Sequence, residues 1–144
     1  MHSVFKWVEE KIGSVFQSPR EGVFGTRIKA FEIVGIDGEK VSIKFEGSKY
    51  PALPLKKWMF ERVLEHLHNN EGKFVPIGAR IGPPYILNSV EGAIWEAPVP
   101  KNLSKYKVAP HICDVLELAG IVELGPVFRP NSRRRLQGVR VCAK

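Results

Sequence analysis

The last third of the chain constrains the fold most strongly, because one helical pattern there is followed by two strand patterns. A helix is expected over about 109–119, since Pro110 fits the first turn of a helix. Gly120 suits the position directly after a helix, where the backbone often becomes left-handed. The expected strands are 121–124 and 138–143, on either side of a loop over 125–137 that holds three consecutive arginines. The pattern therefore predicts a helix followed by a β-hairpin.

Positive charge is concentrated in the same part of the chain. The whole chain has a formal net charge of +7, and residues 101–144 hold nine bases and three acids, a net charge of +6. The first hundred residues therefore contribute only +1. A basic surface that served solubility alone would be spread more evenly. The distribution predicts a local anion-binding face.

The N-terminal residues have the pattern of an amphipathic helix. Ser3 is a residue type that favours helix starts, and the apolar positions from Val4 to Phe16 fall on one face at helical spacing. The stretch from Ser18 to Gly22 then breaks the pattern. We expect the apolar face to pack on the body of the protein. The alternative is an arm that contacts a protein partner or forms a homodimer.

A β-hairpin is expected after this helix. Apolar and polar residues alternate over 40–46, which predicts a strand, and a first strand is expected over about 28–36. Asp37 and Gly38 lie between them, and this dipeptide tolerates positive φ at both positions of a tight turn. The alternation of apolar and polar residues along the first strand shifts by one position at Gly35, which predicts a β-bulge.

Two further helices and one extended piece fill the region between the hairpin and residue 109. The expected elements are a helix over 55–69 with Pro54 at its start, an extended piece over 74–78 and a short capped helix over 89–96. The fold class is therefore α+β. We divide the chain into an N-terminal helix and β-hairpin over 1–53 and a second part over 54–144, together one compact unit.

The sequence excludes several classes of protein. No apolar run reaches the length of about 20 residues that a membrane-spanning helix needs. The first residues lack a secretory signal, so the expected location is the cytoplasm. Cys113 and Cys142 have no metal-ligand spacing and are expected to be plain thiols, although a bridge between them is conceivable in a heat-adapted organism. The low glutamine content fits such a source.

Candidate catalytic residues are sparse. His66 and His68 lie two residues apart on an expected helix and point in different directions, so they cannot share a metal ion. The same argument applies to His111 and Cys113. No phosphate-binding glycine loop, zinc motif or nucleophile elbow is present. We expect no enzymatic activity, no catalytic residue, no metal site and no cofactor.

The order of elements from residue 54 onward resembles the winged helix-turn-helix family of DNA-binding proteins. In that family three helices pack around one core, and a two-stranded hairpin, the wing, follows the third helix. The resemblance covers about residues 54–144 and is one of pattern. It implies an α+β fold in which an N-terminal helix and β-hairpin precede a winged-helix-like three-helix unit with a C-terminal β-hairpin wing.

The resemblance implies two sets of nucleic-acid contacts. The third helix would read bases in the major groove with residues around its start, and the wing would lie along the backbone or in the minor groove. The implied residues are Lys105, Tyr106, Lys107 and His111 at the helix, and Arg129, Asn131, Arg133, Arg134 and Arg135 in the wing. The connection over 97–108 is longer than the usual turn of this motif. Either the third helix begins earlier, or this loop is an insertion.

The expected function is binding of double-stranded DNA, as a regulator or as the recognition part of a larger DNA-processing assembly. Two alternatives remain. One is a protein–protein interaction module in which the basic C-terminal part meets an acidic partner. The other is RNA binding, which competition between duplex DNA, single strands and structured RNA would reveal.

Overall fold

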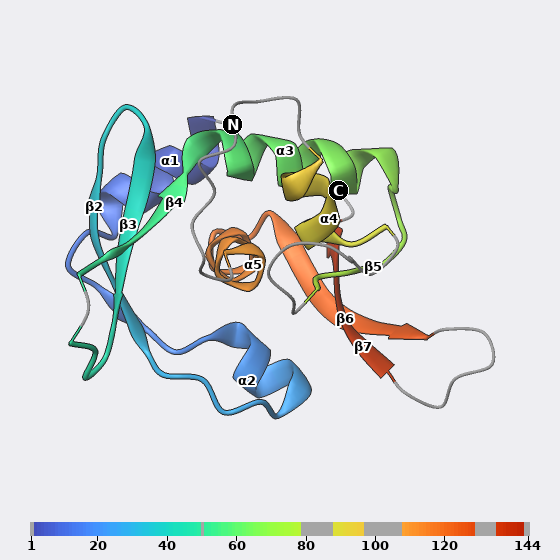
Figure 1. Cartoon of the computed structure of the whole chain (residues 1–144), viewed down its shortest axis with the longest axis horizontal. Coiled ribbons are helices and arrows are strands. Elements are labelled where there is room, and N and C mark those ends of the chain that lie inside the picture. Colours follow the sequence, from blue (N-terminus) through green and yellow to red (C-terminus); the bar gives the residue numbers. More distant parts are fainter. Residues whose placement is uncertain (1, 50, 79–87, 97–107, 129–134, 143–144) are drawn as a thin grey trace.

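The computed structural model describes residues 2–49, 51–78, 88–96, 108–128 and 135–142. Within these ranges the chain is an α+β protein with five helices and two antiparallel sheets (Figure 1). The helices are α1 (His2–Glu10), α2 (Pro19–Phe24), α3 (Lys57–Asn69), α4 (Val90–Trp95) and α5 (Ala109–Leu118). The strands are β1 (Val15–Phe16), β2 (Phe31–Ile36), β3 (Lys40–Phe45), β4 (Leu53–Lys56), β5 (Val75–Pro76), β6 (Val122–Phe128) and β7 (Arg135–Val141).

The first sheet has the strand order β1-β2-β3-β4 and contains the expected hairpin. The register shifts between Ile33 and Gly35, which confirms the predicted bulge. The turn differs from the expected one, because Gly38 does not have a positive φ. Instead a carboxylate oxygen of Asp37 accepts hydrogen bonds from the backbone N–H groups of Glu39 and Lys40, at 2.7 and 3.0 Å. The side chain of Asp37 therefore holds a three-residue turn.

Helix α1 ends earlier than its apolar pattern predicted. Gly13 has a φ of 87°, and its N–H donates to the carbonyl of Ile33, so the chain reverses there. Val15 and the residue after it then form β1, which pairs with β2 instead of continuing the helix. Val4 and Val8 are fully buried in the core. The expectation that the apolar face of this helix packs on the protein's own body is confirmed.

Strand β4 occupies a stretch that was expected to be a loop and the start of a helix. Pro54 lies in β4 opposite Ser42 of β3, and α3 begins only at Lys57. β4 is an edge strand of the sheet, and an edge strand tolerates a proline because one side of it needs no backbone donor. The strand crosses the boundary expected between residues 53 and 54. One hydrophobic core contains residues of both parts, from Val4 to Val139.

The second sheet has the strand order β5-β7-β6, and its hairpin is longer than expected. β6 and β7 pair from Val122 opposite Val141 to Phe128 opposite Arg135, so the expected loop over 125–137 was too long at both ends. Gly125 suggested a loop but lies inside β6. A Cβ atom there would come within 2.4 Å of the Phe74 ring. The strand therefore has a glycine at this position, which lets the Phe74 ring lie against its backbone.

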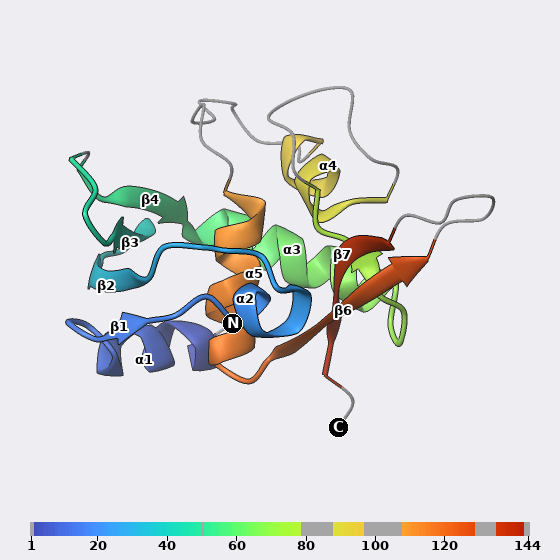
Figure 2. The ribbon, with the colours of Figure 1, turned by 90° about the horizontal axis from the view of Figure 1, so that it is seen from below.

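Helix α5 lies at the centre of the molecule (Figures 1 and 2). Its bounds agree with the prediction, and Gly120 directly after it has a φ of 77°. Helix α4 also begins as predicted, because the Ser89 hydroxyl accepts a hydrogen bond from the N–H of Gly92 at 3.0 Å. In the described part of the chain, every helix is too short or too polar to cross a bilayer.

Candidate nucleic-acid interface

The free end of the β6–β7 hairpin carries an exposed aromatic ring beside a guanidinium group. Phe128 ends β6 and Arg135 begins β7, and the two residues are opposite each other in the ladder. The side chain of Phe128 is 67% exposed, and the Arg135 Cζ atom lies 5.3 Å from the centre of its ring. Figure 2 shows this end of the hairpin pointing away from the body of the protein. The contact is a cation–π interaction at the surface.

This pair of groups has the chemistry of a nucleic-acid contact. A guanidinium group can donate two parallel hydrogen bonds to a phosphate, and it remains charged at every physiological pH. An exposed phenyl ring can stack on bases or pack against sugars. The ring also limits the positions that the Arg135 guanidinium adopts, so less side-chain entropy is lost on binding.

The base of the hairpin is anchored to the rest of the molecule. Arg140 of β7 forms an ion pair with Glu123 on the neighbouring strand, and its Cζ atom lies 4.2 Å from the centre of the Phe74 ring. The side-chain amide of Gln137 donates a hydrogen bond to the hydroxyl of Thr26 at 2.7 Å. These contacts fix the direction of the hairpin. They also engage Arg140 internally, so it is not a candidate for contacting phosphate.

The structure separates the two expected site residues that it describes. Arg135 lies at the free end of the hairpin, whereas His111 lies in α5 against Phe45 of β3, with ring centres 4.8 Å apart. β3 and the hairpin end are on different sides of the molecule (Figure 1). The other expected contacts lie outside the described residues: Lys105, Tyr106, Lys107, Arg129, Asn131, Arg133 and Arg134.

Helix α5 has no exposed residue, and seven of its ten residues are buried. Helices α2 and α4 and strand β6 contact it, and Phe45 of β3 covers His111. A helix that reads bases in the major groove needs one open face. In this packing α5 could enter a groove only if the N-terminal elements moved away. Its reading of bases stays a prediction and is not supported by the observed burial.

A buried ion pair, which the sequence did not reveal, holds α2 against α5. The Arg20 guanidinium donates to both carboxylate oxygens of Asp114, at 2.8 and 3.0 Å, and the Ser18 hydroxyl donates to the same carboxylate at 2.8 Å. Asp114 is fully buried, and Arg20 is 8% exposed. Burial raises the pKa of Asp114, and the hydrogen bonds from Arg20 and Ser18 oppose that change.

Sequence signals for this cluster were only partial. Ser18 followed by Pro19 is a helix start, and the structure has Ser18 as the N-cap of α2 with Pro19 in the first turn. The sequence predicted a break from Ser18 to Gly22, whereas the structure has a helix of six residues, α2, beginning at Pro19. The partner of Arg20 lies 94 positions away, and no local pattern can indicate a pairing over that separation.

Neither cysteine is an activated nucleophile. Cys113 and Cys142 are both free thiols, which confirms the expectation of plain cysteines. Burial raises the pKa of both thiols, so the reactive thiolate is disfavoured at neutral pH. Among the described residues, no three histidine, cysteine, aspartate or glutamate side chains are grouped so that they could hold a metal ion.

No family of known proteins matches this chain, and neither a curated protein nor a solved structure is significantly similar to it.

Proposed function

We propose that this protein binds nucleic acid, with double-stranded DNA as its partner, through the free end of the β6–β7 hairpin. The observation that carries the proposal is the exposed Phe128 ring with the Arg135 guanidinium beside it. The sequence between these two residues, 129–134, holds three arginines and no acid. Positive charge and an exposed aromatic ring therefore belong to one short stretch of chain, a combination that suits a phosphate backbone.

We further propose that residues 57–141 are a winged-helix unit with this hairpin as its wing. The order α3, β5, α4, α5, β6 and β7 supports the resemblance, because three helices are followed by a two-stranded hairpin. Strand β5 lies between the first two helices and pairs with β7 of the hairpin. That pairing, with the anchors of Arg140 and Gln137, would keep the wing at a constant angle to the helices.

Binding would be mainly electrostatic. The arginines of the hairpin would contact phosphates along the backbone or enter a narrow minor groove. A second contact would come from 97–107, the sequence that leads into α5, because it holds Lys101, Lys105 and Lys107 and no acid. Helix α5 itself is enclosed, so base reading by this helix is not part of the proposal. We therefore expect weak sequence preference.

The test is a salt titration of binding to a duplex of about 20 base pairs. Each phosphate contact that is lost lowers the slope of log affinity against log salt by about 0.9. The variant R133A/R134A/R135A should lose affinity and show a shallower slope. The matched control is K6A/K40A/K44A, which removes the same charge from exposed positions on α1 and β3. Equal affinity and equal salt slope for the two variants would show that the hairpin does not contact the duplex.

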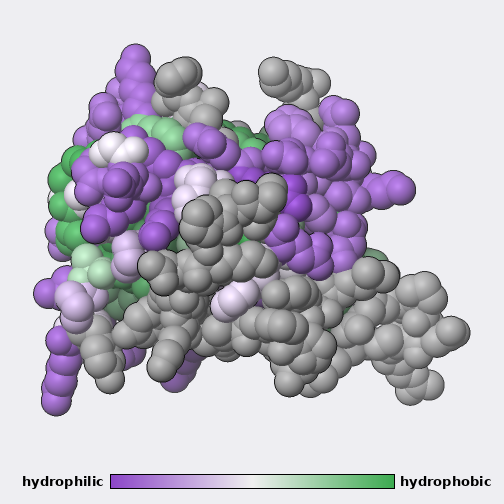
Figure 3. All heavy atoms as spheres, turned by 45° about the horizontal axis from the view of Figure 1, so that its top comes forward, coloured by the Kyte–Doolittle hydropathy of each residue, from purple (hydrophilic) through white to green (hydrophobic). Residues whose placement is uncertain are grey.

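A protein-binding function is the second candidate, and exposed apolar side chains favour it. Ile12, Val15 and Val34 are 48%, 63% and 37% exposed. They lie in β1 and β2 or in the turn before β1, and Figure 3 shows hydrophobic surface on the side of the molecule where this sheet lies. If duplex DNA and RNA both fail to bind at low salt, and I12S/V15S/V34S abolishes self-association or co-purification with another protein, this candidate replaces the first.

A further inference from the structure

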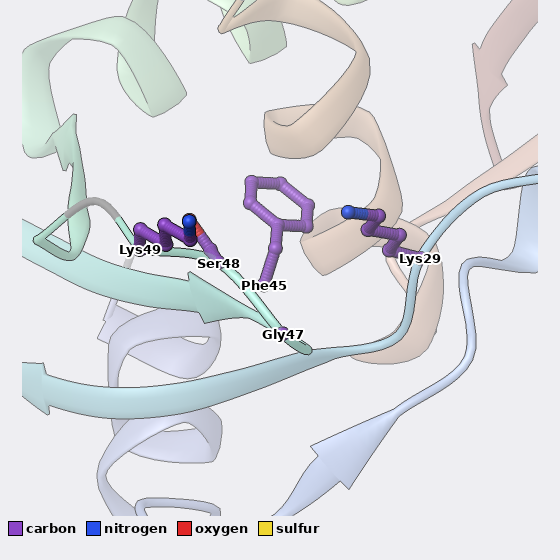
Figure 4. Close-up of a pocket in the computed structure, with 5 residues that line it drawn as sticks. All are labelled: Lys29, Phe45, Gly47, Ser48 and Lys49. Atoms are coloured by element: carbon purple, nitrogen blue, oxygen red, sulfur yellow. The ribbon is translucent and has the colours of Figure 1, made fainter.

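A hollow of about 560 Å³ opens beside Phe45, at the end of β3 (Figure 4). The described residues that line it are Lys29, Phe45, Gly47, Ser48 and Lys49. Strand β3, at whose end it opens, is on the side of the molecule away from the free end of the hairpin (Figure 1). Phe128 and Arg135, the described residues of the proposed DNA contact, do not line it, so a ligand bound there would be additional to the contact at the hairpin end.

Local sequence explains how the hollow forms. Phe45 shares the inner face of the sheet with Phe31, the residue opposite it on β2. The next residue, Glu46, points to the other face because side chains alternate along a strand. Gly47 then has a φ of 71°, a left-handed conformation that turns the chain away from the sheet. The turn leaves one side of the Phe45 ring uncovered by the strand.

Two lysines face this ring from different parts of the chain. Lys29 precedes β2 and Lys49 follows β3, and Figure 4 shows both ammonium groups directed toward Phe45. In the described part of the chain, neither lysine is in an ion pair. The nearest acids in sequence, Glu32 and Glu46, each follow a phenylalanine of the inner face and therefore point to the opposite face of the sheet. Two positive charges beside one ring, with no carboxylate among the described residues that line the hollow, favour an anion.

The aromatic wall of the hollow is held in place. The Phe45 ring meets the Phe31 ring edge-on at 6.4 Å and the His111 ring at 4.8 Å between centres. These contacts fix the orientation of the ring before any ligand arrives. A fixed ring loses little entropy when a flat group stacks on it, so it is suited to bind an aromatic ligand.

We propose that this hollow binds a nucleotide, with the base against Phe45 and the phosphate between Lys29 and Lys49. The volume falls within the range of about 300–1,000 Å³ that is usual for small-molecule sites. Stacking on an aromatic ring combined with lysine contacts to phosphate is the usual way of binding an unpaired nucleotide. The ligand is either a free mononucleotide or an unpaired nucleotide of a strand, since both present the same chemistry.

The first experiment measures the affinity of the full chain for AMP, adenosine and inorganic phosphate by calorimetry. AMP should bind more tightly than either fragment. K29A/K49A should weaken AMP binding by about tenfold or more, because each charge-assisted hydrogen bond contributes about a factor of ten. F45L should also weaken it while leaving phosphate binding unchanged. The matched control K6A/K40A should bind AMP as the unmodified chain does.

Thermal melting of each variant shows whether it is folded, and K29A/K49A should melt normally because both lysines are exposed. The proposal is overturned if AMP does not bind, or if K29A/K49A binds it normally. It is also overturned if phosphate alone binds as tightly as AMP, since Phe45 would then have no part.

A second set of measurements identifies the source of the nucleotide. If the ligand is part of a strand, single-stranded oligoadenylate should bind more tightly than AMP, and K29A/K49A should weaken both. If the ligand is free, oligoadenylate should bind no better than AMP. The hairpin variant R133A/R134A/R135A should retain normal AMP affinity in either case. A result against nucleotide binding in the hollow can thus be distinguished from a result against the proposed duplex contact.

Discussion

Helix α5 and the β6–β7 hairpin follow one another in sequence, and both were expected to contact nucleic acid. Only one of them presents side chains to solvent. α5 has no exposed residue, whereas the hairpin ends in a Phe128 side chain that is 67% exposed. The difference comes from the N-terminal part of the chain, because α2 and β3 cover α5 and leave the hairpin end open. A helix-and-hairpin pattern therefore does not decide which of its parts can bind.

The arginines next to α5 and in the hairpin do not all have the same role. Arg20 is paired with Asp114 of α5, and Arg140 at the base of the hairpin is paired with Glu123. These charges are used within the fold. At the hairpin end, the guanidinium of Arg135 contacts the Phe128 ring and forms no ion pair with any described residue. Of the two described arginines in the hairpin, only Arg135 thus keeps its charge for a partner.

The largest expected effect comes from the ion pair that encloses α5. D114A should lower the free energy of unfolding by about 3–5 kcal/mol, because it leaves the Arg20 guanidinium buried without its partner. Urea denaturation measures the change. The control is E65A, which removes the partner of Arg62 from a largely exposed pair and should cost at most about 1 kcal/mol. If D114A cost no more than E65A, α2 would not hold α5 in place.

The next effect concerns the base of the hairpin. G125A should lower the free energy of unfolding by about 1–3 kcal/mol, because the new methyl group would overlap the Phe74 ring. F74L in the same chain should recover part of the loss by making room. The control is G22A, since a Cβ atom at Gly22 meets no atom within 4 Å. Equal stability of G125A and G22A would show that the hairpin is not seated on Phe74.

A smaller effect is expected at the free end of the hairpin. F128A should weaken duplex binding by about two- to fivefold, which corresponds to the loss of one exposed cation–π contact with Arg135. The free energy of unfolding should change by less than about 0.5 kcal/mol, because the ring is exposed. F128W keeps an aromatic face and should bind as tightly as the unmodified chain. Normal affinity of F128A would exclude a role for this ring.

The smallest expected effect is on the reactivity of Cys113 in α5, which shows whether this helix becomes accessible when DNA binds. Cys113 should react with Ellman's reagent only after unfolding, because it is fully buried and burial raises the pKa of its thiol. Saturating duplex DNA should leave this protection unchanged if the hairpin makes the contact. C142S removes the other thiol, so the signal comes from Cys113 alone. Rapid modification of Cys113 in the presence of DNA would instead favour α5 as a reading helix.

The elements that were predicted correctly have strong local signals. Ser89 caps α4 and Gly120 follows α5, and in both cases the residue type itself satisfies or permits the backbone geometry. The first hairpin and its bulge at Gly35 also follow from alternation along adjacent residues. Errors occurred where a distant contact decided the outcome. Val15 joined β1 because β2 was available as a partner, and Gly125 remained in β6 because Phe74 lies over it.

The features of the candidate site also divide into those that local sequence predicted and those that depended on contacts between distant residues. The basic character of 129–134 and the position of Arg135 after it were visible in the sequence. The pairing of Arg135 with the Phe128 ring required the full β6–β7 ladder, which the sequence pattern made too short. The hollow beside Phe45 could not be predicted, since Lys29 precedes the first hairpin and Lys49 follows it, and both line one hollow only after the hairpin has closed.

By itself the sequence determined the α+β class, the first hairpin, the final helix and the concentration of positive charge near the C-terminus, because periodicity, capping and charge are local properties. Only the tertiary structure decided that α5 is enclosed and that the hairpin end is open. The physical reason is that burial depends on contacts between distant segments. Arg20 and Asp114 are 94 positions apart, and their ion pair helps to close the N-terminal part over the helix.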